Sequence, residues 1–110
     1  TDRSITARIE RLAASLPSTD GDKLRAQFRT DRNAVQAARG DYEKARNGIR
    51  AVLRREPFDA PALEDSMSKA RAARQDFDQA LQSVIAKAAV EMSAAGRQAL
   101  ADWPRPGRQR

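Results

Sequence analysis

Two sustained heptad patterns run along the chain, and a short turn separates them. Each places apolar side chains on two positions of a seven-residue repeat, as packed helices require. The first, from about residue 20 to 55, has Phe28, Val35, Tyr42 and Ile49 on one position and Ala38, Ala45 and Val52 on the other. The second, from about residue 60 to 91, has Leu63, Ala70, Phe77 and Val84 on one position and Met67, Leu81 and Ala88 on the other. Two long helices are therefore predicted.

The segment between the two patterns carries helix stop and start signals. Pro57 disfavours continuation of the first helix, and Asp59 is a favourable N-cap for the second. A connection this short joins antiparallel neighbours. Folding the chain there places Tyr42 opposite Arg74, a charged residue in the apolar seam, and a cation–π contact would make that buried charge tolerable.

A short helix is predicted on each side of this hairpin. Ile5, Ile9, Leu12 and Leu16 have the spacing of one helical face. Pro17 ends that helix, and the next one begins near Asp20, whose carboxylate would complement the helix dipole. Ser93 is predicted to cap a last helix that runs to about Asp102. The predicted fold is all-α: a long antiparallel helical hairpin with short N- and C-terminal helices in one domain, residues 1–103, followed by a basic, flexible tail, residues 104–110.

Composition excludes several kinds of chemistry. Of the 110 residues none is cysteine and none is histidine, so disulfides, thiolate sites and imidazole catalysis are absent. Acidic pairs occur at Asp20 and Asp22, at Glu64 and Asp65, and at Asp76 and Asp78. Their spacing matches no known cation loop, and helix-start compensation or solvation explains each pair. The sequence predicts no enzyme, no cofactor and no dedicated metal site.

Basic residues are concentrated on the first long helix. The net charge is +6, and a row of arginines recurs beside the apolar seam. Its members are Arg25, Arg29, Arg32, Arg39, Arg46 and Arg50. In the antiparallel arrangement the row faces polar side chains that cannot neutralise it. Two interpretations stay open: a solvated helix face, or a binding surface for an acidic partner. The few aromatic residues belong to the seam, which argues against nucleic acid as that partner.

Two glycines have two interpretations each, whereas two methionines have one. Gly40 and Gly48 lie inside the first long helix, where they mark either a bend or close chain approach, or a tolerated surface position. Met67 fits the seam and Met92 precedes the last helix, so both are predicted to be core residues.

The chain resembles the periplasmic heavy-metal resistance and heavy-metal sensor proteins, which are related to zinc-resistance-associated proteins and to spheroplast-protein-Y-like chaperones. Four segments carry the resemblance. They are Leu16-Pro17 before Asp20, the run from Leu24 to Arg29, the turn Arg54-Arg55-Glu56-Pro57-Phe58-Asp59 with the following Ala62-Leu63-Glu64, and Met92-Ser93-Ala94-Ala95. The resemblance covers residues 5 to 103, and the turn is its most specific part.

This resemblance implies a four-helix hooked fold, a homodimer and a periplasmic location. It also implies a segment before Thr1 that secretes the protein or anchors it to the inner membrane. Some members sense metals and signal to a membrane-bound regulator, whereas others hold unfolded clients. The sequence departs from both patterns: the chaperone signature has lost its glutamine in the segment from Met92 to Gly96, and Gln82 stands where a sensor histidine would be sought.

The functional prediction is accordingly a non-enzymatic, periplasmic, protein-binding domain. It would act as a sensor or modulator of envelope stress or metal resistance, with a membrane regulatory protein as its partner. Three alternatives remain: an ATP-independent holdase for unfolded clients, a divalent-metal sensor that uses carboxylates, and a structural coiled-coil adaptor. The arginine row is the predicted partner-binding surface.

Overall fold

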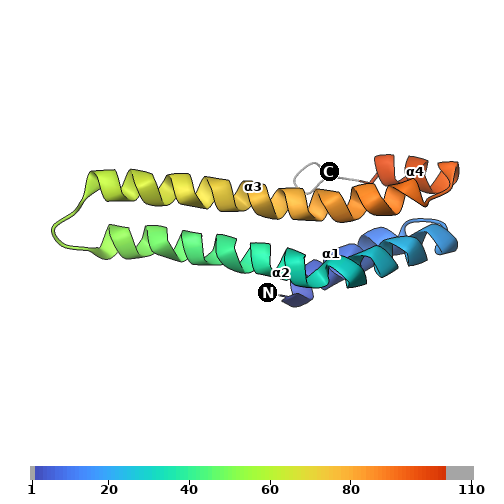
Figure 1. Cartoon of the computed structure of the whole chain (residues 1–110), viewed down its shortest axis with the longest axis horizontal. Coiled ribbons are helices and arrows are strands. Elements are labelled where there is room, and N and C mark those ends of the chain that lie inside the picture. Colours follow the sequence, from blue (N-terminus) through green and yellow to red (C-terminus); the bar gives the residue numbers. More distant parts are fainter. Residues whose placement is uncertain (1, 104–110) are drawn as a thin grey trace. The chain divides into compact units, whose positions relative to one another are not determined.

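The computed structural model describes residues 2–103, and this part of the chain is helical without any strand (Figure 1). The helices are α1 (Asp2–Ala14), α2 (Ser18–Arg54), α3 (Ala60–Val90) and α4 (Ala94–Ala101). The predicted all-α class and element order are confirmed. The predicted tail, residues 104–110, lies outside the described residues. None of the described helices combines the length and apolarity needed to cross a bilayer.

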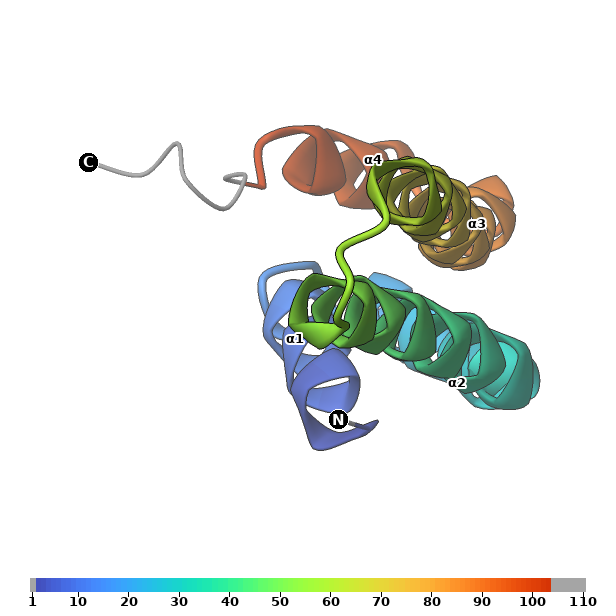
Figure 2. The same ribbon diagram turned by 90° about the vertical axis from the view of Figure 1, so that its left-hand side faces the viewer.

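Contacts divide the chain into two compact units. Unit 1 comprises residues 1–31 and 83–110, and unit 2 comprises residues 32–82. Within unit 2, α2 and α3 lie side by side and antiparallel, joined by the turn that follows Arg54 (Figures 1 and 2). The Asp59 carboxylate accepts a hydrogen bond of 3.0 Å from the Ala62 backbone N–H, so Asp59 caps α3 as predicted. The predicted hairpin is thus the architecture of unit 2.

Unit 1 holds most of the buried core. Among the described residues, ten of the thirteen buried apolar side chains belong to it, contributed by α1, the segment between α1 and α2, both long helices and the segment before α4. They are Ile5, Ile9, Leu12, Ala13, Leu16, Leu24, Phe28, Val84, Ala88 and Met92. Met92 is only 5% exposed, which confirms its predicted core position.

A carboxylate on α2 organises the start of α4 inside unit 1. Asp20, only 2% exposed, accepts hydrogen bonds from the Ser93 backbone N–H at 2.9 Å and from the Ser93 hydroxyl at 2.7 Å. The same hydroxyl accepts a bond of 3.0 Å from the Gly96 N–H, so Ser93 is the N-cap of α4 as predicted. These bonds lower the pKa of Asp20, and the positive charges of Lys23 and Arg97 add to the effect. Asp20 therefore joins two helices in addition to compensating the start of its own.

Two cations complete the same junction. The last carbonyls of a helix lack intrahelical partners and are stabilised by positive charge. The Lys23 ammonium donates to the Glu91 carbonyl at 2.6 Å, and the Arg97 guanidinium donates to the Met92 carbonyl at 2.8 Å. The chain between α3 and α4 is consequently held by side chains of α2 and α4.

Two of the three glycines of α2, Gly40 and Gly48, have no packing role. A Cβ atom added to Gly40 or Gly48 would meet nothing within 4 Å, so close chain approach is excluded at both positions. Replacing both with alanine is expected to raise the free energy of unfolding, by up to about 1 kcal/mol per site, because alanine loses less backbone entropy in a helix. Urea denaturation measures this, and a destabilised double variant would contradict it.

Candidate functional site

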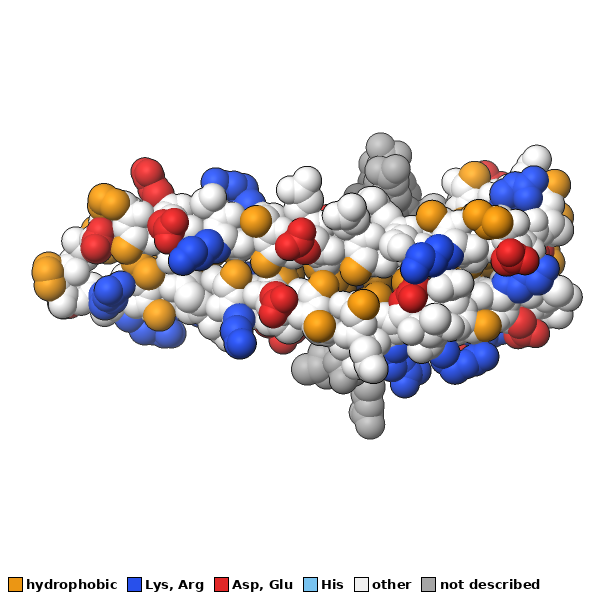
Figure 3. All heavy atoms as spheres, viewed as in Figure 1, with side chains coloured by type: hydrophobic (Ala, Val, Ile, Leu, Met, Phe, Trp, Pro, Cys, Tyr) orange, Lys and Arg blue, Asp and Glu red, His pale blue; other side chains and the backbone are white. Residues whose placement is uncertain are grey.

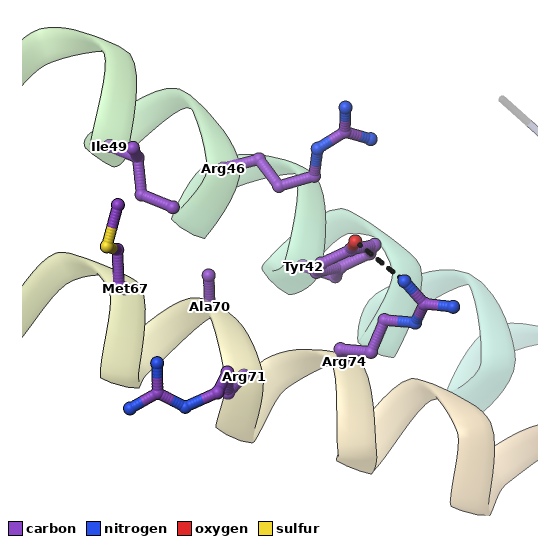
Figure 4. A pocket seen from close by; sticks show the side chains of 7 residues that line it. All are labelled: Tyr42, Arg46, Ile49, Met67, Ala70, Arg71 and Arg74. Atoms are coloured by element: carbon purple, nitrogen blue, oxygen red, sulfur yellow. Dashed lines mark hydrogen bonds between the residues drawn. The ribbon is translucent and has the colours of Figure 1, made fainter.

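A groove of about 520 Å³ opens between the two helices of unit 2. Tyr42, Arg46 and Ile49 line it from α2, and Met67, Ala70, Arg71 and Arg74 line it from α3 (Figure 4). Met67 points from α3 toward Ile49, and Ala70 also faces α2, so these three side chains form an apolar floor (Figure 4). In the space-filling view, hydrophobic side chains show between the two helices, with cationic side chains on either side (Figure 3).

The floor is partly exposed, at Met67 and to a lesser extent at Ile49, because unit 2 has few residues to cover it. Only Val35, Val52 and Ala70 are buried apolar residues of this unit. The remaining seam side chains, such as Tyr42, Ile49 and Phe77, are half-buried. Met67 is 40% exposed, so its predicted core position is wrong: two helices alone do not enclose every seam position.

Tyr42 organises the positive charge at one end of the groove. Its ring stacks on Phe77, with the centroids 6.4 Å apart. The guanidinium carbons of Arg46 and Arg74 lie 5.6 Å and 5.8 Å from the centroid of the Tyr42 ring, within cation–π range. Arg74 also points its Nη1 at the tyrosine hydroxyl, 3.4 Å away. The predicted contact between Tyr42 and Arg74 is confirmed, but the Arg74 side chain is 63% exposed rather than buried.

The guanidinium groups around the groove have few carboxylate partners. Among the described residues, no ion pair joins Arg46 or Arg71 to an acidic side chain, and Arg74 has only a long contact of 3.9 Å with Asp78. Residues 39–50 and 67–75 together carry seven basic and two acidic side chains. Guanidinium groups of this kind suit bidentate binding of a carboxylate.

The arginine row predicted from the sequence is partly neutralised. Arg25, in unit 1, binds both oxygens of Glu10 at 3.0–3.1 Å, which raises its pKa, and also pairs with Asp22 at 3.0 Å. In unit 2, Arg39 pairs with Glu43 at 3.1 Å. The expectation that the row lacks neutralising partners is therefore wrong for these two arginines, because the carboxylates come from α1 and from α2 itself.

The other members of the row differ in their surroundings. Arg50 donates to the Asn47 side chain at 2.8 Å, and Arg46 lies at the groove. Arg29 and Arg32 are exposed. Partner binding by the row remains a prediction, and the structure brings only Arg46 of its members to the groove. Sequence reasoning did not assign Arg71 or Met67 to a site, and it noticed Arg74 only as an interruption of the seam.

One carboxylate of each predicted acidic pair already has a partner. Among residues 2–103, no three acidic, histidine or cysteine side chains gather closely enough to hold a metal ion. Asp20 binds Ser93, Asp65 pairs with Lys69 at 3.2 Å, and Asp78 faces Arg74. Histidine and cysteine are missing from the whole sequence, so the donors that transition metals prefer are not available. The residues present do not fit a resident metal.

Comparison with known proteins adds one finding. The family model described as heavy-metal resistance matches residues 1–99, which is nearly the entire described chain. No curated protein and no solved structure matches.

Proposed function

The chain belongs to the heavy-metal resistance family, and we propose that it serves resistance by binding a protein partner through the groove of unit 2. The single observation that carries the proposal is an apolar floor bordered by the guanidinium groups of Arg46 and Arg71, which pair with no carboxylate among the described residues. The family is one of resistance and binding proteins, which fits a role without catalysis. It also supports the periplasm as the location.

We further propose that the protein is a modulator whose partner is a regulatory protein of the cell envelope. A metal response would then reside in the partner, because this chain offers no imidazole or thiolate ligand. Calorimetry with nickel, cobalt, zinc and copper ions should show no micromolar binding. Saturable binding at that level would instead support sensing through carboxylates.

Complementation in the native host tests this function. In a strain that lacks the gene, the wild-type chain should restore growth in inhibitory metal, and an Arg46→Glu/Arg71→Glu variant should not. Arg8→Glu is a control, because Arg8 is an exposed arginine of α1 in unit 1 that belongs neither to the arginine row nor to the groove. Circular dichroism checks that all three proteins fold. Full complementation by the double variant would refute the proposal.

A holdase is the second candidate, favoured by large apolar side chains exposed in unit 2. Leu53 is 54% exposed and Phe58 is 53% exposed. Surfaces of this kind bind unfolded chains with little sequence selection. A holdase would suppress aggregation of several unrelated model clients at stoichiometric amounts, whereas a modulator with one partner would not.

A further inference from the structure

We propose that the groove of unit 2 binds an acidic amphipathic helix, which places one apolar stripe on the floor and carboxylates against the arginines at both edges. This inference rests on the proposed function and specifies the partner. Two helices that expose the groove between them present the surface that a third helix covers in a helical bundle.

The floor determines the apolar part of the partner. A volume of about 520 Å³ lies in the range of sites that enclose small groups of side chains, and Ile49, Met67 and Ala70 offer no polar atom to an incoming group. Methionine adapts its shape to different apolar surfaces. Leucine-like side chains at helical spacing of three or four residues would fill the space along the groove.

The arginines at the edges of the groove determine which charge the partner helix carries. Arg46 leaves α2 and Arg71 leaves α3, so the guanidinium groups stand on different sides of the floor (Figure 4). Because neither pairs with a carboxylate among the described residues, the occupant must supply the negative charge on both flanks of its apolar stripe. The same segments of a second copy, residues 39–50 and 67–75, would bring seven basic and only two acidic side chains, so charge complementarity favours a different, acidic chain.

Tyr42 positions two guanidinium groups, so the groove favours a partner that has a carboxylate close to the Tyr42 ring. Its ring is held by Phe77 and contacts the guanidinium groups of Arg46 and Arg74. Guanidinium groups restrained before binding lose less side-chain entropy when a carboxylate arrives. A partner that places a carboxylate near Tyr42 therefore gains more binding free energy than a partner that places it on a mobile surface arginine.

Fluorescence anisotropy with a synthetic peptide tests the proposal. The probe is a labelled helix-forming peptide of about 18 residues, with leucine every third or fourth position and glutamate on both flanks. The full chain should bind it, and added salt should weaken the binding. Arg46→Glu/Arg71→Glu should weaken it by about tenfold or more, and Arg8→Glu on α1 should leave it unchanged. A peptide with lysine in place of glutamate should not bind.

Three results would overturn the proposal. They are equal binding of the lysine peptide, unchanged affinity in the double variant, and preferential binding of vesicles of anionic phospholipid through the same arginines. The last result would assign the groove to a membrane surface. If the peptide fails while complementation still requires Arg46 and Arg71, only the helical partner is refuted. If complementation does not require them, the proposed function is refuted as well.

Discussion

Replacing Gly96 with alanine is expected to lower the free energy of unfolding by about 1–3 kcal/mol, as overpacking of a tight site does. A Cβ atom on Gly96 would overlap the carboxyl group of Asp20, which is buried against the start of α4. Asp20 cannot move away without losing its two hydrogen bonds to Ser93. The same methyl group that should stabilise α2 at Gly40 should therefore destabilise the protein at Gly96.

Urea denaturation of the single variants measures the difference directly. Gly40→Ala is the matched control, because it makes the identical chemical change in open space. Gly21→Ala is a second test, since its Cβ atom would overlap the backbone carbonyl of Ala13 where α1 approaches α2. Equal stability of Gly96→Ala and wild type would show that the junction between Asp20 and α4 does not form in solution.

The second large effect is expected from Asp20→Asn. The asparagine keeps the size of the side chain but removes the charge that faces the Ser93 N–H, Lys23 and Arg97. It also replaces one of the two carboxylate oxygens that accept hydrogen bonds with an amide NH2 group, which cannot accept one. Buried acceptors that bind charged or backbone donors contribute more than exposed ones, so the variant should be clearly less stable at neutral pH.

The pH dependence of the stability distinguishes the contribution of the Asp20 charge from that of the side chain's shape. The pKa of Asp20 is lowered by folding, so the unfolded chain takes up the proton first as the pH falls. The stabilisation is complete above the ordinary value of 3.8 and is lost as the pH drops through the lowered folded value. The difference in stability between wild type and Asp20→Asn should accordingly shrink below about pH 4. A difference that stays constant from pH 7 to pH 2.5 would contradict this account.

Much of the fold could be predicted from the sequence because its signals are local. Heptad spacing, the Asp59 cap and the Ser93 cap each involve residues within one or two helical turns. The bond between Asp20 and Ser93 spans 73 positions and depends on how α4 folds back within unit 1. Asp20 also had a sufficient local explanation as a dipole partner, so nothing in the sequence indicated its second role.

The candidate site was only partly predictable for a similar reason. The arginine row was derived from one helix and its expected neighbour, but Glu10 of α1 neutralises Arg25. The seam pattern predicts a core, yet Met67 is 40% exposed, because the two helices of unit 2 alone do not enclose every seam position. One local signal in the sequence did indicate the site. Arg74 is a charged residue in the apolar seam, and it lies at the groove.

The central claim is that an acidic amphipathic helix binds in the groove of unit 2, and nuclear magnetic resonance tests it most directly. The isotope-labelled chain would be titrated with the glutamate-flanked peptide, and backbone amide shifts would be followed for each residue. The account predicts saturable shifts concentrated at residues 42–49 and 67–74, which Arg46→Glu/Arg71→Glu abolishes. Shifts confined to unit 1, or none at all, would contradict it.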